Sequence, residues 1–301
     1  MNRSQPNNKG SRYVLITAAR NEEAYIERTL QSVVAQTVLP QKWVIVSDGS
    51  TDNTDEIVRR WAAKYDFIEL LRREADAGRN FASKVYAIRA GFGRLNRTEY
   101  EFLGNLDADI SFEPDYYGRV LAAFEENPKL GIAGGILFEP CRAKGVQQWT
   151  STSWSVSGPI QMFRRQCYED IGGFIPLRDG GEDAVVEVMA RMHGWEVRSL
   201  PDITVFHHRV TGTAKGGIFS ARFRQGAMEY VLGYHPLFEI AKCLFRVRER
   251  PYLLGSWFRL SGYAWAFFRG VQREVPDSVI KFLRREQIQR LYNVVSHNKS
   301  L

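Results

Sequence analysis

The sequence predicts an α/β fold in which a mostly parallel, mixed sheet is flanked by helices and followed by a helical, aromatic and basic C-terminal extension. Three observations support this prediction: short apolar runs alternate with helical periodicity from Tyr13 onward, aspartates follow two of these runs, and the composition changes beyond Gly216. Strands that alternate with helices favour parallel pairing through right-handed crossovers. A chain of 301 residues is long enough for one such domain and an appendage.

The alternating elements fill most of the chain before Gly216. Apolar runs predict strands, and apolar residues that recur every three or four positions predict helices. Strands are expected at 13–17, 42–47, 68–71, 101–106, 130–137 and 203–206, and helices near 26–34, near 57–61 and over 81–95, 116–127 and 183–193. Ligands of such sheets bind beyond the carboxyl ends of the strands, which are therefore where we expect a site.

Three aspartates stand where predicted strands end. Asp107 and Asp109 are two residues apart after an apolar run, so an extended backbone points both side chains to the same side. Paired carboxylates suit Mg²⁺ or Mn²⁺, and such an ion also takes ligands from substrate phosphates. Asp48 follows the second strand and can accept a base N–H or ribose hydroxyls at the same edge. The alternative for each is a turn or helix-capping residue.

Further charged residues are candidates for both halves of a transfer reaction. Arg79 and Lys84 offer cations for a diphosphate, or are solvated helix positions. Glu182 and Asp183 begin a helix after two glycines, where a carboxylate either stabilises the helix dipole or takes a proton from an acceptor hydroxyl. His207 and the histidine after it point opposite ways, so at most one is expected to bind a metal or phosphate, and a surface pair is the alternative.

The net charge of +7 belongs to the segment beyond Gly216, because basic residues outnumber acidic ones only there. Its aromatics and arginines are typical of a segment that rests on anionic lipid. The most apolar stretch, 252–268, contains Arg259 and is shorter than the about 20 residues of a spanning helix. Alternatives are packing against the catalytic domain or a homodimer contact. No recognition motif accompanies the charge, which argues against a nucleic-acid partner.

The ends and the cysteines indicate the setting. Residues 1–12 are polar and lack the apolar core of a secretory signal, so they are expected to form a disordered lead-in to a catalytic domain over 13–215 and an extension over 216–301. The three cysteines have neither a disulfide framework nor zinc-ligand spacing. A cytoplasmic protein, peripheral on the inner face of the cell membrane, is the prediction.

Six segments, taken in order, resemble family 2 glycosyltransferases with the Rossmann-like GT-A fold. They are 16–22 (ITAARNE), 46–52 (VSDGSTD), 106–109 (LDAD), 156–159 with 163–165 (VSGP and FRR), 171–174 (IGGF) and 181–183 (GED). The resemblance covers roughly 13–212, most of the chain. It differs from the family pattern at Ala18, where proline is usual, and near Lys84, where a second asparagine is common.

The resemblance also implies roles for individual residues. Nucleotide contacts would come from Ala18, Arg20, Glu22 and Asp48, and metal–diphosphate binding from Asp107 and Asp109, with His207 as a further metal or phosphate ligand. Asp183 would be the base of an inverting displacement, and Glu182 would bind the acceptor. The cofactor would be Mn²⁺ or Mg²⁺.

The expected reaction moves a sugar from a nucleotide sugar, by default a UDP-sugar, to a hydroxyl of a saccharide or lipid-linked saccharide in cell-surface polysaccharide assembly. The Q-x-x-R-W signature of processive synthases is absent from the sequence, which favours one transfer per encounter. Alternatives are polyprenyl-phosphate glycosyl transfer, nucleotidyl transfer with release of pyrophosphate, and a non-catalytic nucleotide-sugar-binding scaffold.

Overall fold

The computed structural model describes residues 12–74, 82–141, 145–148, 152–209, 217–248 and 252–297. By their contacts, these residues form two compact units. The first takes the described residues within 1–78, 86–173 and 195–209, and the second those within 79–85, 174–194 and 210–301. The predicted lead-in, apart from Arg12, lies outside the described residues.

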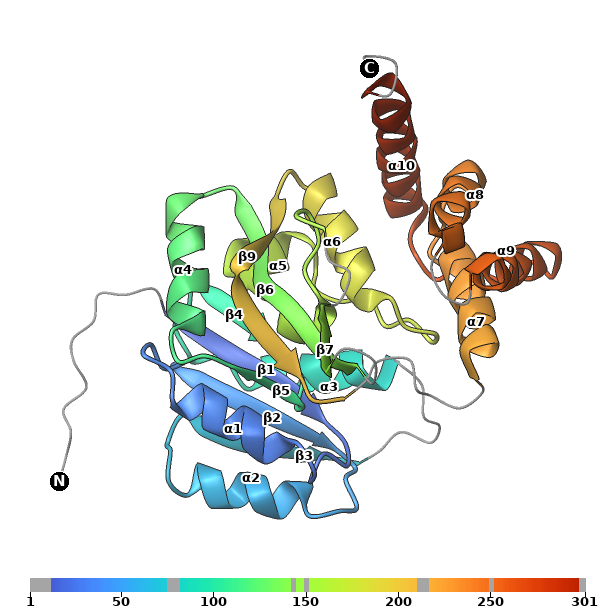
Figure 1. The fold of residues 1–301 in the computed structure, drawn as a ribbon. Helices are drawn as coiled ribbons and strands as arrows, with labels where there is room; N and C mark the ends of the chain where they lie inside the picture. The colour runs from blue at the N-terminus through green and yellow to red at the C-terminus, as the bar shows by residue number, and fades with distance from the viewer. Residues whose placement is uncertain are drawn as a thin grey trace. The chain divides into compact units, whose positions relative to one another are not determined.

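The first unit is built on one mixed sheet (Figure 1). Its order among the described residues is β3-β2-β1-β4-β8-β6-β9-β5, and β7 pairs with β6. The strands β3, β2, β1 and β4 pair parallel with one another, and β6 pairs parallel with β9, whereas β8, β5 and β7 pair antiparallel with their neighbours. The bounds are β1 (Tyr13–Ala19), β2 (Lys42–Asp48), β3 (Ile68–Arg73), β4 (Phe102–Asn105), β5 (Ile110–Phe112), β6 (Leu130–Cys141), β7 (Gly145–Gln148), β8 (Met162–Arg164) and β9 (Glu196–His207). The predicted fold class is confirmed.

Helices of the first unit cover this sheet. They are α1 (Ile26–Val34), α2 (Thr54–Ala62), α3 (Ala82–Gly93, whose first residues belong to the second unit), α4 (Tyr116–Glu126) and α5 (Arg165–Asp170), with a 3₁₀ turn at Gly158–Ile160. In α1 the buried Ile26, Leu30 and Val33 recur at helical spacing and form its inner face. The helices α1 and α2 lie side by side (Figure 1).

The core explains why the central strands read as continuous apolar runs. Val14 to Ile16 of β1 and Val44 to Val46 of β2 are almost fully buried, as expected for parallel strands covered on both faces. The registers pair Ala19 with Ser47, and Ile16 with Asn105 of β4. The carboxyl ends of β1, β2 and β4 therefore meet at one edge of the sheet.

Several strands differ from their predicted bounds. The run expected at 203–206 is only the end of the longer β9, and the run expected at 130–137 continues to residue 141. Pro201 interrupts the apolar pattern of β9. The pairing of β9 with β6 shifts register between Gly134 and Ile136 of β6. The short β5, β7 and β8 were not predicted, because three or four residues carry no readable period.

The second unit is helical. It contains α6 (Glu182–Met192), α7 (Gly217–Val231), α8 (Pro236–Phe245), a 3₁₀ turn (Arg246–Arg248), α9 (Tyr252–Phe268) and α10 (Asp277–His297). Arg191 of α6 pairs with Glu286 of α10, Nε to Oε1 at 2.8 Å, so α6 groups with the C-terminal helices. The division at residue 215 stays a prediction. Within the described residues, no helix is both long enough and apolar enough to cross a bilayer.

The helices α7 and α9 touch through their backbones. A Cβ atom on Gly226 of α7 would lie 1.8 Å from the carbonyl oxygen of Arg259, and one on Gly262 of α9 would lie 2.0 Å from that of Phe223. Neither glycine can carry a side chain unless the helices move apart. This close crossing holds the side chains between α7, α8 and α9 in place.

Candidate functional site

The first corner of the candidate site is Asp48, the last residue of β2. Its register partner on β3 is Arg73, whose NH1 lies 3.1 Å from Asp48 Oδ1. Arg20, just after β1, brings its NH1 to 4.0 Å from Asp48 Oδ2. The carboxylate is buried and held by two cations, a suitable acceptor for base or ribose donors. Neighbouring Ala18 is half-buried on β1, beside Val46.

The turn between β4 and β5 carries Asp107 and Asp109. The Thr29 hydroxyl of α1 donates to the Ala108 carbonyl at 2.8 Å and accepts the N–H of Ile110 at 3.1 Å. The Asp107 N–H donates to the Pro159 carbonyl at 3.0 Å. The backbone between the two aspartates is therefore fixed from both sides, with Asp109 buried and Asp107 half-buried.

His207 is paired with Ile110 in the β5–β9 register, which brings its ring to Asp109. Its Nε2 lies 3.1 Å from Asp109 Oδ2, and its Nδ1 lies 2.9 Å from Oε1 of the buried Glu139 on β6. Burial lowers the pKa of His207, but the hydrogen bonds to Asp109 and Glu139 outweigh it and raise the pKa to about 9. A histidine held by a carboxylate at one nitrogen is typical of metal-binding histidines.

The next histidine has different neighbours. His208 Nε2 lies 2.8 Å from the Ser111 hydroxyl and its Nδ1 lies 3.1 Å from Arg28 NH1. Burial, and then the Arg28 charge, lower its pKa. The two rings face different partners, as the extended backbone predicts.

Glu22, in the turn after β1, faces the aspartate pair. Burial raises its pKa to about 7; Arg209 lowers the pKa, while the charges of Asp109 and Asp107 raise it. Arg209 forms an ion pair with Glu22, and its Nε lies 3.3 Å from Asp109 Oδ2. Its guanidinium also lies over the Tyr25 ring, 5.2 Å from the centroid. The charges of Asp107 and Asp109 thus act on Glu22, and Arg209 pairs with Glu22 and Asp109.

A divalent ion fits this site as a partner of the substrate. In the part of the chain that the structure describes, no three His, Cys, Asp or Glu side chains converge to hold a metal by themselves. Asp109 and His207 offer an oxygen and a nitrogen ligand, and Mg²⁺ and Mn²⁺ sites with few protein ligands are completed by water and phosphates. The guanidinium of Arg209 on Asp109 and Glu22 shows that these carboxylates accept a cation.

Three residues near the site were not predicted as candidates: Arg73, Glu139 and Arg209. Arg73 could have been found from the register of β3 with β2. Glu139 lies beyond the predicted end of its strand, and Arg209 follows the histidine pair without a pattern of its own. Glu139 and Arg209 are recognised as site residues only by their contacts with segments far away in the sequence.

The remaining predicted residues belong to the second unit or lie outside the described residues. Arg79 falls outside the described residues, and the half-buried Lys84 on α3 belongs to the second unit. Glu182 and Asp183 also belong to the second unit, at the start of α6, where Gly181 before them has φ +93°. Glu182 is buried, and Asp183 Oδ1 accepts the N–H of Ala184 at 2.9 Å. Their catalytic roles stay predictions.

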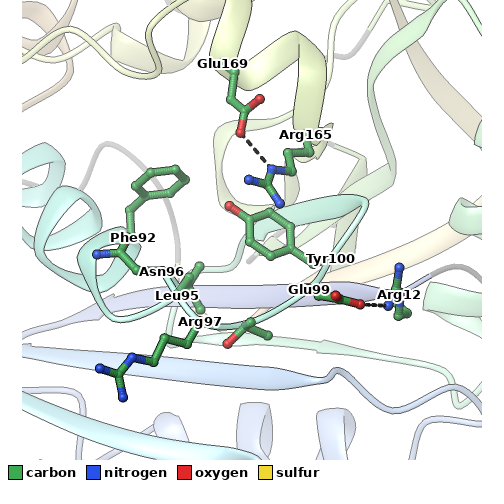
Figure 2. A pocket seen from close by; sticks show the side chains of 10 residues that line it. Arg12, Phe92, Leu95, Asn96, Arg97, Glu99, Tyr100, Arg165 and Glu169 are labelled. Atoms are coloured by element: carbon green, nitrogen blue, oxygen red, sulfur yellow. Dashed lines mark hydrogen bonds and ion pairs between the residues drawn. The ribbon is translucent and has the colours of Figure 1, made fainter.

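A cavity of about 490 Å³ in the first unit is separate from the aspartate edge (Figure 2). Its lining includes Arg12 and Tyr100, which precede β1 and β4, so it opens at the amino ends of those strands. Figure 2 shows two ion pairs among its charged side chains, Arg165 with Glu169 and Arg12 with Glu99. The cavity is therefore not part of the candidate donor site.

The fold is of the GT-A class: a mixed sheet with acidic side chains at the carboxyl ends of β2 and β4 and an imidazole at the end of β9. The model of glycosyl transferase family 2 matches residues 14–176, and the chain belongs to that family. This confirms the resemblance seen in the sequence motifs.

Relatives and solved structures agree with this assignment. The chain is 31% identical to a poly-beta-1,6-N-acetyl-D-glucosamine synthase of Staphylococcus epidermidis over 238 residues, 72% of this chain and 55% of that protein. The chain thus spans about half the length of the curated relative it matches.

Two solved structures share the fold. A mannosyltransferase from Pyrobaculum calidifontis, in complex with GDP-Man and Mn²⁺, has a TM-score of 0.55 and 18% identity over 91% of this chain and 73% of that one. TarS 1–349 of S. aureus, in complex with UDP-GlcNAc, has a TM-score of 0.54 and 19% identity over 90% of this chain and 79% of that one.

Proposed function

We propose that the chain is an inverting glycosyltransferase that moves a sugar from a UDP-sugar to a hydroxyl of a lipid-linked saccharide in cell-surface polysaccharide assembly. The observation that carries the donor half is the fixed edge at which Asp48, Asp107, Asp109 and Glu22 lie with their cationic partners. A relative that is named for N-acetylglucosamine polymer synthesis and a TarS complex with UDP-GlcNAc make this the first donor to test.

In the donor half, Asp48 accepts hydrogen bonds from the base or ribose, with Arg20, Ala18 and Glu22 lining the same corner. Asp107, Arg79 and Lys84 contact the nucleotide and its diphosphate. Asp109 and His207 would hold Mn²⁺ or Mg²⁺, whose charge would stabilise the nucleoside diphosphate as it leaves.

In the acceptor half, Asp183 takes the proton of the acceptor hydroxyl while that oxygen attacks the anomeric carbon. The bond from this carbon to the diphosphate oxygen breaks on the opposite face, and its electron pair leaves with the nucleoside diphosphate. One displacement inverts the configuration. Glu182 binds a second acceptor hydroxyl, and each encounter transfers one sugar.

The reaction is tested with UDP-GlcNAc, Mn²⁺ and a lipid-linked saccharide extract. We expect UDP release in the parent and at least a hundredfold slower release in Asp183→Asn, with the exposed Asp202→Asn as matched control. Equal rates in Asp183→Asn would remove Asp183 from its role. Pyrophosphate release would indicate nucleotidyl transfer, a glycosylated polyprenyl phosphate would indicate that alternative, and binding without turnover would indicate a scaffold. Long polymer products would contradict single transfer.

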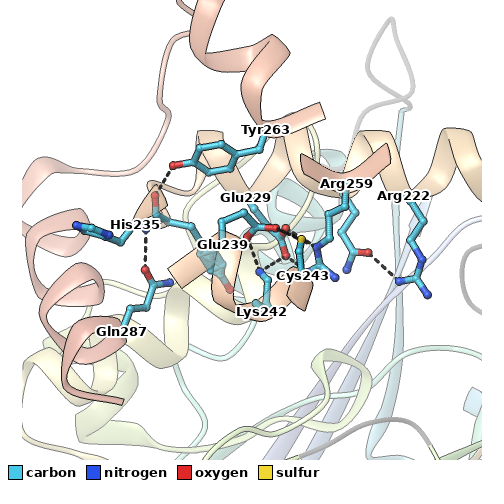
Figure 3. A network of polar contacts seen from close by, with 11 residues as sticks. Arg222, Glu229, His235, Glu239, Lys242, Cys243, Arg259, Tyr263 and Gln287 are labelled. Atoms are coloured by element: carbon cyan, nitrogen blue, oxygen red, sulfur yellow. Dashed lines mark hydrogen bonds and ion pairs between the residues drawn. The ribbon is translucent and has the colours of Figure 1, made fainter. Parts of the chain in front are cut away.

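The helical unit suggests a location for the enzyme at the membrane that carries the acceptor. Its helices α8 and α9 expose many large apolar side chains and bury the charged side chains of Glu239 and Arg259. Glu239 of α8 and Arg259 of α9 are buried, and Figure 3 shows them in one polar cluster with Glu229 and Lys242. By contrast, Trp257 is 68% exposed. The exposed large apolar residues of these helices are Leu237, Ile240, Leu244, Phe245, Tyr252, Leu253, Leu254, Trp257, Trp265, Phe267 and Phe268.

This apolar face of α8 and α9 suits an anionic membrane surface. Exposed large apolar residues in such number indicate an interaction site, and tryptophans favour the interface of a bilayer. Arg246 follows α8 and Arg269 follows α9, so cations lie next to the apolar residues for contact with lipid phosphates. We infer a peripheral enzyme on the inner face of the cell membrane, without a nucleic-acid partner.

Vesicle flotation tests this location. The parent should float with vesicles that contain phosphatidylglycerol more than with neutral ones, and Trp257→Ser with Phe268→Ser should abolish most of the binding. Tyr292→Ser on α10, an equally exposed aromatic, is the control. If the parent is instead a stable dimer by light scattering and ignores vesicles, the face is a homodimer contact.

A further inference from the structure

The carboxylates proposed to serve the donor already hold a cation of the protein itself. Arg209 forms ion pairs with both Glu22 and Asp109, whose side chains are only 13% and 8% exposed. These two carboxylates come from the turns after β1 and β4, so one guanidinium links two strand ends. The two cationic contacts of Asp109 share one atom, because His207 and Arg209 both approach Oδ2.

We propose that Arg209 is the resident cation of the donor site: it neutralises Glu22 and Asp109 when no donor is bound, yields Asp109 to the divalent ion, and then binds the donor's diphosphate. This inference rests on the proposed function. It assigns Arg209 a role in binding that the sequence did not indicate.

Electrostatics requires the exchange. A guanidinium and a divalent ion at the same carboxylate oxygen repel each other, so the ion binds Asp109 fully only when Arg209 moves. Without either cation, the charges of Glu22, Asp107 and Asp109 repel one another. The pKa of Glu22 is raised by burial and also by the charges of Asp109 and Asp107. Arg209 therefore lowers the cost of keeping three carboxylates together before the donor arrives.

Arg209 is also able to move and to bind phosphate. Its side chain is 43% exposed, in contrast to the carboxylates it contacts. It follows the end of β9, and its backbone is in none of the strand pairs of the described residues. A planar guanidinium donates two parallel hydrogen bonds to a phosphate, which an ammonium cannot do. In the present position the guanidinium lies over the ring of Tyr25.

The first measurement is Mn²⁺ binding without nucleotide, followed by electron paramagnetic resonance. Because a half-exposed guanidinium competes only moderately, we expect Arg209→Ala and Arg209→Gln to bind Mn²⁺ about 3- to 10-fold more tightly than the parent. Arg209→Lys, which keeps the charge, should remain within about twofold of the parent. Arg28→Ala removes an arginine that contacts His208 instead of the carboxylates, and should change nothing.

The second measurement is UDP binding by calorimetry at saturating Mn²⁺. We expect about tenfold weaker binding in Arg209→Ala and a smaller loss in Arg209→Lys, whose ammonium makes no bidentate contact. Thermal melts of each variant confirm that it is folded. Unchanged or weaker Mn²⁺ binding in both neutral variants would overturn the exchange, and unchanged UDP binding would overturn the diphosphate contact.

The Mn²⁺ experiment separates this inference from the proposed function, since it uses neither acceptor nor sugar. Tighter Mn²⁺ binding in Arg209→Ala together with no glycosyl transfer by the parent would retain the resident cation and refute the reaction. If neither the parent nor the neutral variants bind Mn²⁺, the exchange is refuted directly.

Discussion

The buried ionic cluster of the helical unit gives a sharp prediction for Arg259→Met. Arg259 is 4% exposed on α9, and its Nε lies 2.8 Å from Glu229 Oε2 and 3.3 Å from Glu239 Oε1. Lys242 Nζ lies 2.8 Å from Glu229 Oε1 and 2.7 Å from Glu239 Oε2. Figure 3 shows the four side chains converging. Two acids and two bases thus balance within the described residues of this cluster.

Methionine keeps the length of the side chain but leaves two buried acids with one base. Breaking a buried pair in this way costs about 3–5 kcal/mol of unfolding free energy. Lys242 still contacts both acids, so we expect the lower end, about 3 kcal/mol at pH 7. Removing one acid as well, in Arg259→Met with Glu239→Gln, should recover at least about 1.5 kcal/mol through the coupling of neighbouring sites.

The loss should shrink on acidification. Burial, and then the charge of Glu229, raise the pKa of Glu239 above its usual value of 4.5. A carboxyl with a raised folded pKa favours folding as pH falls, and loses this contribution as pH rises through its unfolded and then its folded pKa. Without Arg259 the pKa of Glu239 rises further, so the deficit should decrease from pH 7 toward pH 5. Burial raises the pKa of Glu229, but Lys242 and Arg259 outweigh burial and hold the pKa below its usual value of 4.5. The stability that Glu229 contributes is therefore lost only as the pH falls through 4.5 and below.

Urea unfolding, followed by circular dichroism at pH 5 and 7, measures these differences. Arg285→Met, at an exposed position of α10, is the matched control and should change the unfolding free energy by no more than about 0.5 kcal/mol. A loss below about 1 kcal/mol in Arg259→Met, or a deficit that grows at pH 5, would refute this account of the cluster.

Three further predictions concern positions with close contacts. Glu139→Gln weakens the hydrogen bond that orients His207 and should lower Mn²⁺ affinity in the presence of UDP about tenfold; unchanged paramagnetic resonance titrations would contradict this. Gly226→Ala places a methyl group against the carbonyl of Arg259 and should lower the unfolding free energy by about 3 kcal/mol, which an unaltered melting temperature would disprove. Arg73→Ala removes the nearer cation of Asp48 and should weaken UDP binding about tenfold by calorimetry, against no change in the exposed Arg60→Ala.

The sheet could be predicted from the sequence because its central strands are covered on both faces. Burial on both sides makes β1 and β2 continuous apolar runs, and that signal is local. The edge location of Asp48 and Asp107 then follows from parallel pairing alone. By contrast, β5 and β8 have three residues each and exist only through their pairing with distant strands. Their neighbours in space could not be read from a window of the sequence.

The site divides along the same line. Asp107 and Asp109 are marked by their spacing, whereas Glu139 and Arg209 become part of the site only because β9 pairs with β6 on one side and with β5 on the other. A shift of β9 by one residue against β5 would turn His207 away from Asp109, and a shift against β6 would turn it away from Glu139. The spacing of residues predicts carboxylates at an edge, but only the pairing of strands determines which cations meet them.

The helical extension shows a different limit of prediction from sequence: a pattern does not determine which face of a helix is buried. A pattern such as 252–268, with one arginine among aromatics, is ordinarily interpreted as an apolar inner face with the charge outside. In α9 the arginine is buried instead, because Glu229 of α7 and Glu239 of α8 replace the water that would otherwise solvate Arg259. Once these charges are paired inside, most of the large aromatic residues of α9 are left on the surface, although Tyr263 is buried. The ion cluster and the proposed membrane face are therefore consequences of one packing arrangement, so a variant that opens the cluster should also alter vesicle binding.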